Sequence, residues 1–84
     1  MDTTRHAGQI VVVTGAGYGI GRATALRFAR EGATVVGLDV SDEGLRLAAE
    51  EFEAAGVKVT LVKADITSQA DVDRVIDETV AAHG

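Results

Sequence analysis

Residues 14–21 read TGAGYGIG and directly follow the apolar run IVVV at residues 10–13. A short β-branched run of this kind is typical of a buried strand. The residues from 20 to 31 are helix formers, so the glycines lie where a strand turns into a helix. The start of a helix presents free N–H groups and a partial positive charge, which suit a phosphate. We therefore interpret residues 14–21 as a phosphate-binding turn.

The individual glycines of this turn have separate expected roles. Gly15 can take a positive φ at the turn, and Gly19, without a Cβ, lets the backbone approach a pyrophosphate. Gly21 lets the helix pack closely on the strand. The general G-x-G-x-x-G pattern would need glycine at position 20, where Ile20 stands, so the spacing is instead T-G-x-x-x-G-x-G. A tight strand-to-helix turn needs glycine even where nothing binds, and that alternative stays open.

The rest of the chain alternates between strand and helix patterns. Gly32 and Gly56 end two helices, and Ser41 and the Ser68–Asp71 pair begin the second and third. The expected segments are strand 10–13, helix 20–31, strand 34–38, a helix from Ser41 to Gly56, strand 57–62 and a last helix ending near residue 84. This βαβαβα order predicts an α/β fold, the N-terminal half of a Rossmann-type doubly wound parallel sheet with strand order 3-2-1. We expect one partial domain over residues 1–84, with residues 1–8 frayed.

Composition and charge exclude several classes of function. The 84 residues carry a formal net charge of −5, and there is no basic run, which argues against nucleic acid and anionic membrane as partners. Cysteine is absent, so disulfides and thiol chemistry are excluded. Neither a signal peptide nor a long apolar segment is present in the sequence, and we expect a cytoplasmic protein. His6 and His83 have no ligand pattern around them that would indicate a metal.

Asp39 lies 18 residues after Gly21, at the end of the second expected strand. A carboxylate there can accept hydrogen bonds from both hydroxyls of an adenosine ribose, and its charge would repel a 2′-phosphate. Its neighbours are Leu38 and Val40, with no arginine or lysine beside it. We therefore expect NAD to be preferred over NADP. The alternative is that Asp39 is only a turn or capping acid before the second helix.

Asp65 and Ile66 follow the third expected strand. At the carboxyl end of a parallel strand they could edge an adenine pocket. Asp65 could equally be an acid that begins the next helix. The spacing does not decide between these two interpretations.

Three segments together resemble the short-chain dehydrogenase/reductase family. They are residues 14–25, which open with the glycine turn, residues 35–39 with the aspartate, and residues 63–67. The likeness extends over residues 8–84. An extended type of the family would need glycine at position 18, where Tyr18 stands, so the resemblance is to the single-domain dehydrogenases.

The resemblance implies roles for particular residues. Gly15, Gly19, Ile20 and Gly21 would surround the pyrophosphate, and Tyr18 would flank the adenosine side. Asp39 would hold the ribose, and Asp65 and Ile66 would edge the adenine. The candidate cofactor-binding residues are therefore Gly15, Gly17, Tyr18, Gly19, Ile20, Gly21, Asp39, Val40, Asp65 and Ile66. The implied chemistry is hydride transfer between NAD(H) and a secondary alcohol or ketone, in a full-length protein expected to be a homo-oligomer.

The catalytic tyrosine and lysine that the resemblance implies are not found in this sequence. The only tyrosine is Tyr18, and Arg22 stands four residues later. Ser41 and Ser68 have no histidine–acid pair to activate them and are interpreted as helix caps. We expect the 84 residues alone to lack catalysis, as the N-terminal part of an oxidoreductase. The alternatives are a stand-alone dinucleotide-binding module without catalysis and, with less support, an interaction piece that uses an open strand edge.

Overall fold

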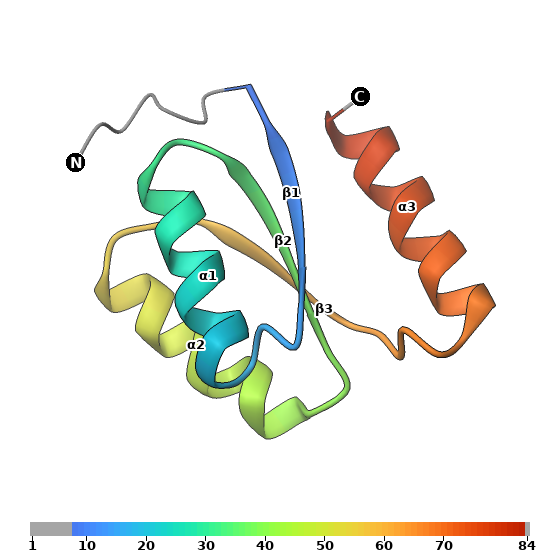
Figure 1. The fold of residues 1–84 in the computed structure, drawn as a ribbon, viewed down its shortest axis with the longest axis horizontal. Helices are drawn as coiled ribbons and strands as arrows, with labels where there is room; N and C mark the ends of the chain where they lie inside the picture. The colour runs from blue at the N-terminus through green and yellow to red at the C-terminus, as the bar shows by residue number, and fades with distance from the viewer. Residues whose placement is uncertain (1–7, 84) are drawn as a thin grey trace.

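The computed structural model describes residues 8–83, and these form three strands and three helices in alternation (Figure 1). The elements are β1 (Ile10–Thr14), α1 (Gly19–Arg30), β2 (Thr34–Asp39), α2 (Asp42–Ala54), β3 (Val59–Lys63) and α3 (Gln69–His83). The expected frayed segment, including His6, lies outside the described residues except for Gly8. Within residues 8–83 no helix has the length and apolar character needed to cross a membrane.

The three strands form one parallel sheet with β2 in the middle. Val11 of β1 is in register with Val35 of β2, and Val35 is in register with Val59 of β3. The strand order is β1-β2-β3, which is the predicted order 3-2-1 counted from the other edge. The fold is therefore the predicted βαβαβα arrangement of an open, Rossmann-type sheet. The strands end at Thr14, Asp39 and Lys63, and because they are parallel these carboxyl ends lie at the same edge of the sheet.

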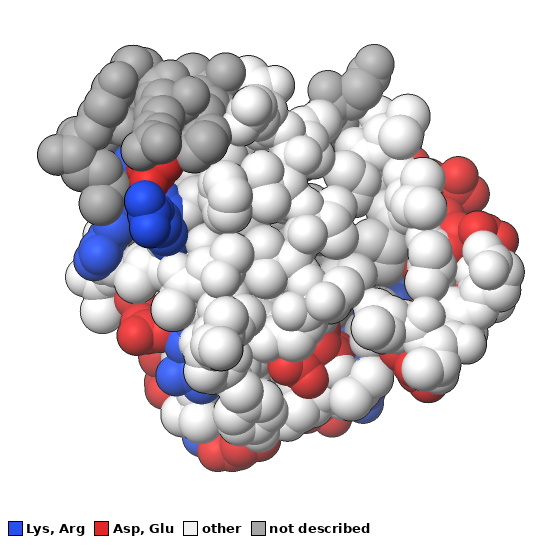
Figure 2. Space-filling view, viewed as in Figure 1, with Lys and Arg blue, Asp and Glu red and all other residues white. Residues whose placement is uncertain are grey.

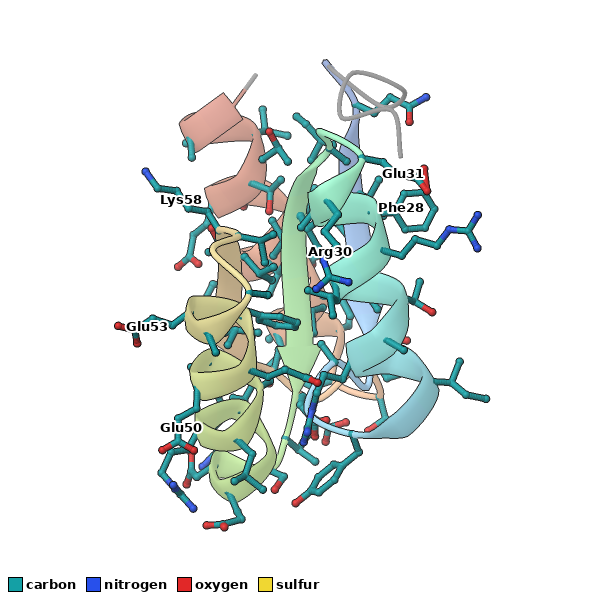
Figure 3. The ribbon with its side chains drawn as sticks, turned by 90° about the vertical axis from the view of Figure 1, so that its left-hand side faces the viewer. Phe28, Arg30, Glu31, Glu50, Glu53 and Lys58 are labelled. Atoms are coloured by element: carbon teal, nitrogen blue, oxygen red, sulfur yellow. The ribbon has the colours of Figure 1, made fainter. Side chains whose placement is uncertain are left out.

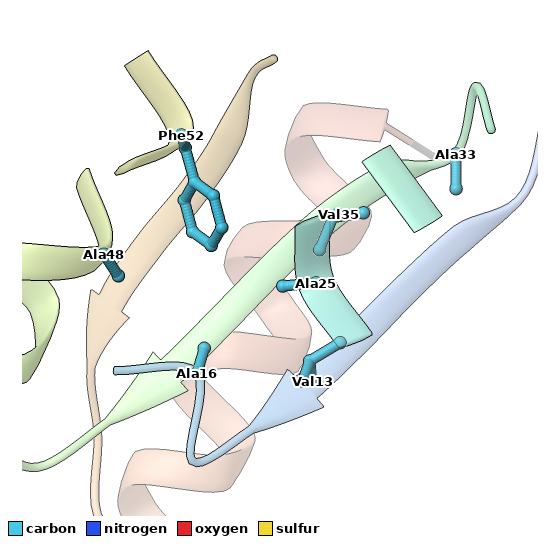
Figure 4. Close-up of a cluster of buried hydrophobic side chains, with 7 residues drawn as sticks. All are labelled: Val13, Ala16, Ala25, Ala33, Val35, Ala48 and Phe52. Carbon is cyan, nitrogen blue, oxygen red and sulfur yellow. The ribbon is translucent and has the colours of Figure 1, made fainter. Parts of the chain in front are cut away.

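Helices α1 and α2 cover one face of the sheet, and α3 lies on the opposite side (Figures 1 and 3). The alternation of side chains along a strand sets this arrangement, because Val35 faces one layer and Val36 the other. The α1–α2 face holds the larger core, drawn in Figure 4: Val13, Ala16, Ala25, Ala33, Val35, Ala48 and Phe52. Figure 3 shows Glu50, Glu53 and Lys58 pointing away from the sheet on this side.

The α3 face has a smaller core. Val36 and Leu38 of β2 pack there with Ala64 and with Val75 of α3. Val75 is buried, but Ile76 and Val80 of the same helix are 54% and 60% exposed. Part of the apolar stripe of α3 therefore has no cover among the described residues.

The predicted boundaries of the third strand were wrong by two residues at its start. Gly56 has a φ of +73°, and the N–H of Val57 donates to the carbonyl of Phe52 at 3.1 Å. Val57 is therefore still bonded to the end of α2, and neither Val57 nor Lys58 belongs to the strand. Pairing with β2 begins only at Val59.

The predicted helix caps are confirmed at Ser41 and Ser68. The Oγ of Ser41 accepts a hydrogen bond from the N–H of Gly44 at 3.0 Å, and the Oγ of Ser68 accepts from the N–H of Asp71 at 3.3 Å. In a reciprocal cap the Asp71 carboxylate would accept from the N–H of Ser68. Here it accepts instead from the N–H of Asp65 at 2.9 Å. The start of α3 is thus connected to the end of β3 instead of closing on itself.

Candidate functional site

A groove of about 360 Å³ opens at the carboxyl ends of the strands. Ends of parallel strands are where open α/β sheets form their ligand crevices. All three strand ends contribute to its walls, which consist of Thr14, Gly15, Leu38, Asp39, Val40, Ala64, Asp65 and Ile66. Five of the candidate residues, Gly15, Asp39, Val40, Asp65 and Ile66, are therefore brought together by the fold.

Asp39 is half-buried at the groove, and both of its carboxylate oxygens have backbone donors. Oδ2 accepts from the N–H of Gly17 at 2.9 Å, and Oδ1 accepts from the N–H of Ser41 at 3.0 Å. The bond to Ser41 is the turn-forming contact that the alternative interpretation of Asp39 requires. An ionised carboxylate has about four acceptor positions, so two remain available. Asp39 can thus form the turn and still accept hydroxyl donors from the groove.

The glycine turn has the backbone conformation that its sequence predicts. Gly15 and Gly19 have φ values of +67° and +47°, and no atom lies within 4 Å of where a Cβ would stand on either residue. Gly21 is different, because a Cβ there would collide with the carbonyl of Gly15. The turn is therefore open toward solvent at residues 15 and 19 and closely packed at residue 21.

The N-terminus of α1 has no side-chain cap. Tyr18 occupies the N-cap position without a capping hydrogen bond, and the first turn has no acidic residue. Among residues 8–83, the N–H groups of Gly19, Ile20 and Gly21 have no hydrogen-bond acceptor. Ile20 itself is 87% exposed. These groups are the free donors that a helix offers to an anion.

Tyr18 lies against the start of α2. Its Oη is 2.9 Å from the Oγ of Ser41, and a Cβ on Gly44 would stand only 2.5 Å from the Cε2 atom of its ring. Half of the Tyr18 side chain is still exposed. The ring therefore contacts the second helix beside Asp39 and does not line the groove.

Both backbone polar groups of Gly17 are hydrogen-bonded to side chains. Its N–H donates to Asp39, and its carbonyl accepts from the Nε of Arg22 at 3.1 Å. The same Arg22 Nε lies 3.6 Å from a carboxylate oxygen of Glu51 in α2. A Cβ on Gly17 would stand 2.8 Å from both Asp39 Oδ2 and the carbonyl carbon of Gly44. The turn and α2 thus approach closely because residues 17 and 44 are both glycine.

Asp65 forms a small turn of its own at the groove. Its Oδ1 accepts from the Oγ1 of Thr67 at 2.6 Å and from the N–H of Thr67 at 2.8 Å. The bond from the Thr67 hydroxyl, followed by that from its amide, lowers the pKa of Asp65 below its ordinary value. The interpretation of Asp65 as an acid near a helix start therefore has a structural basis, while Asp65 and Ile66 also line the groove.

Gly44 was not singled out from the sequence. Its signal was an isolated glycine in the first turn of a helix, where glycine weakens the helix and commonly has a packing reason. The link from Ser41 to Tyr18 and the position of Arg22 were also missed, because each joins residues from different elements. Within residues 8–83, no group of three or more histidine, cysteine, aspartate or glutamate side chains could hold a metal ion.

A second, larger hollow of about 530 Å³ lies between β1 and α3. Val12 and Thr14 of β1 form one wall. Residues of one face of α3 form the other: Val72, Val75, Ile76, Thr79 and Val80. Ile66 belongs to this hollow and to the groove, so the two adjoin. Figure 2 shows that the face between β1 and α3 is largely free of charged residues.

Comparison with known proteins agrees with the fold. The family model described as short chain dehydrogenase matches residues 9–84. Levodione reductase of Leifsonia aquatica is 40% identical over 84 residues, which cover 98% of this chain and 32% of that protein. The citronellol catabolism dehydrogenase of Pseudomonas aeruginosa superposes with a TM-score of 0.87 at 34% identity, over 96% of this chain and 34% of the other. A metagenomic short-chain oxidoreductase solved in complex with NADP has a TM-score of 0.84 at 35% identity, with coverages of 95% and 36%.

The parallel sheet, with the glycine turn that leads from β1 into α1, defines a Rossmann-type α/β fold. This chain belongs to the short-chain dehydrogenase family. It spans about a third of the length of the relatives that it matches.

Proposed function

We propose that this chain is the dinucleotide-binding part of an NAD-preferring oxidoreductase that acts on a secondary alcohol or ketone. The observation that carries the proposal is the Asp39 carboxylate, which lines the groove while two backbone amides hold it in place. The relative that was solved with NADP supports a nicotinamide dinucleotide as the cofactor. The choice between NAD and NADP rests on Asp39 itself.

The groove suits the adenosine end of the cofactor. Val40 and Ile66 are 57% and 56% exposed and offer apolar surface to an adenine ring. Asp39 offers acceptors to the ribose hydroxyls. A 2′-phosphate on that ribose would meet the charge of Asp39, and neither neighbour of Asp39 in the chain is a cation. These features favour NAD.

The open turn suits the pyrophosphate. Gly15 and Gly19 leave space where side chains would stand, and the uncapped start of α1 offers its free N–H groups beside that space. Hydrogen bonds from such groups to an anion are among the stronger ones in proteins. In this proposal Gly19, Ile20 and Gly21 hold the pyrophosphate, and Tyr18 lies toward the adenosine.

The cofactor, when bound, supplies hydride exchange at its nicotinamide ring. The described residues bind and orient its other half. Tyr18 is engaged with Ser41 and Gly44, so we do not assign it to proton transfer with a substrate. In this proposal the residues that bind the substrate and exchange its proton belong to polypeptide beyond the 84 residues.

The apolar hollow between β1 and α3 is where we expect that polypeptide to pack. In a doubly wound sheet the first strand is central, with a further strand on its free edge. Such a strand would cover Val12, Ile76 and Val80, which are about half exposed or more. The homo-oligomeric state expected for the full-length protein stays a prediction.

Calorimetric titration of the full-length protein with NAD, NADP and ADP-ribose tests the proposal. We expect saturable binding of all three, with NAD at least about tenfold tighter than NADP, since one hydrogen bond to a charged group has this magnitude. Asp39→Asn keeps one oxygen acceptor for the two backbone donors, places an NH2 group at the other position and removes the charge. The substitution should weaken NAD binding and reduce the difference in affinity between NAD and NADP. Equal affinity for NAD and NADP in the unsubstituted protein would overturn the preference, and absence of saturable binding would overturn the function.

Turnover separates this proposal from the alternative of a non-catalytic module. If the protein binds NAD but neither reduces any ketone nor oxidises any alcohol in a broad substrate panel, the result would favour the non-catalytic binding module.

A further inference from the structure

We propose that Tyr18, Ser41 and Gly44 form a latch that positions Asp39, and that cofactor selectivity depends on this latch. The inference rests on the proposed function and adds to it three residues that act through Asp39. The latch residues come from the glycine turn, the loop after β2 and the first turn of α2.

The first step is the dependence of Asp39 on the distance between the turn and α2. One of its carboxylate oxygens is bound by Gly17 of the turn, and the other by Ser41, the N-cap residue of α2. The bond from Gly17 joins residues 22 apart and forms only while the turn stays against the loop after β2, whereas the bond from Ser41 is local to that loop. If the turn moved away from α2, Oδ2 of Asp39 would lose its donor, and only the local bond from Ser41 would still hold the carboxylate.

The second step is what keeps the segments together. The ring of Tyr18 lies on Gly44, and its hydroxyl bonds to Ser41, whose Oγ also caps α2 through the N–H of Gly44. Gly17 allows a backbone approach to Gly44 that a side chain would prevent, and Gly44 leaves room for the ring of Tyr18. Arg22 adds a third link, from the carbonyl of Gly17 to Glu51.

The third step concerns Gly44, where a substitution can break the latch without lowering the stability of the fold. The atoms nearest to a Cβ on Gly44 all belong to the Tyr18 ring, at 2.5–3.1 Å. This ring is half exposed and can swing toward solvent. Gly44→Ala should therefore release the ring without damage to the core, while alanine favours the helix. A Cβ on Gly17 would meet backbone of α2, so Gly17→Ala does not allow this separation.

The experiment compares Gly44→Ala, Tyr18→Ala and the double variant in the full-length protein, by NAD and NADP titration and by thermal unfolding. For Gly44→Ala we expect about tenfold weaker NAD binding, a smaller change for NADP and an unfolding midpoint that is not lowered. The double variant should bind NAD no worse than Tyr18→Ala alone, because both substitutions break the same contact. Tyr18→Phe keeps the ring and should lose less than Tyr18→Ala.

Glu43→Ala is the matched control, since it also changes the first turn of α2 but contacts Arg46 and not Tyr18. It should leave the NAD/NADP ratio unchanged. In the ligand-free protein, the amide NMR signals of Gly17 and Ser41 should shift in Gly44→Ala and not in Glu43→Ala.

Three results would overturn the latch. They are unchanged selectivity in Gly44→Ala, an equal loss for NAD and NADP together with a lower unfolding midpoint, and additive effects in the double variant. Each presupposes that the unsubstituted protein prefers NAD. Absence of that preference would instead overturn the NAD preference in the proposed function, and the amide shifts would still report whether the latch holds Asp39.

Discussion

A Cβ on Gly21 would stand 2.1 Å from the carbonyl oxygen of Gly15, closer than any real side-chain contact. Gly15 begins the turn after β1, and Gly21 lies in the first turn of α1. The two glycines therefore set how closely the helix packs on the end of the strand. Gly15 has the positive φ that makes the turn, and Gly21 has the space that closes it.

Gly21→Ala should destabilise the protein strongly, because the new methyl group meets backbone that cannot move independently of β1. We expect a loss in the free energy of unfolding at or above the upper end of about 1–3 kcal/mol, the usual range for overpacking. Urea denaturation of the full-length protein measures it. Gly19→Ala is the comparison: its Cβ would have open space, but its φ of +47° is unfavourable for alanine by about 1–2 kcal/mol. A Gly21→Ala variant more stable than Gly19→Ala would contradict the packing argument.

Phe52→Ala should be among the most damaging substitutions in the core. Phe52 is 3% exposed and is the largest side chain of the core between the sheet and helices α1 and α2. Removing a buried phenylalanine side chain costs about 3–5 kcal/mol. Chemical denaturation would show this as a large fall in midpoint. Glu53→Ala, on the exposed side of the same helix, should change stability by less than about 0.5 kcal/mol, and similar losses for the two variants would sink the prediction.

Acid should weaken the turn at Asp65. The hydrogen bonds from Thr67 lower the pKa of this carboxyl in the folded state below its ordinary 3.8. In acid the unfolded chain then binds the proton more readily than the folded chain. The contribution of Asp65 to stability is therefore complete above its ordinary pKa and is lost as the pH falls through the folded value.

Carbon-13 NMR titration of the Asp65 carboxyl measures this directly. Thr67→Val removes the hydroxyl donor and keeps the side-chain shape, so the pKa of Asp65 should rise toward its ordinary value. An Asp65 pKa at or above the ordinary value in the unsubstituted protein would refute the assignment.

The 84-residue chain on its own should associate. The edge of β1 is unpaired among the described residues, and the adjoining hollow is lined almost entirely by apolar side chains. Unpaired strands with exposed apolar side chains tend to pair with other chains. Sedimentation velocity should show mass increasing with concentration, and Val12→Lys, which places a charge on that exposed face, should reduce the effect. A concentration-independent monomer with a cooperative melt would rule this out.

Much of the fold follows from local patterns. The β-branched run before the glycines, the helix-ending Gly32 and Gly56 and the capping serines all have meanings that hold over a few residues. The wrong start of β3 at Val57 has the complementary reason. A β-branched residue fits a strand or the exit of a turn equally well, and only the register with β2 decides where pairing begins.

The candidate site divides along the same line. The open conformation of Gly15 and Gly19 could be inferred from their spacing, because φ is a property of one residue and its neighbours. The two backbone donors to Asp39 could not be inferred, since one of them comes from Gly17, 22 residues away. In the sequence, Gly44 is only a poor helix former, and its role depends on the ring of Tyr18, which lies against it in the folded structure.

The sequence alone thus determined the order of the elements, the place of the phosphate-binding turn and the aspartate at the end of β2. These features depend on backbone preferences and on periodicity, which act between near neighbours. The tertiary structure decided which groove those residues share, that Asp39 is bound from two segments, and that Tyr18 rests on α2. Such contacts join residues far apart in the chain, and they depend on how strands and helices pack.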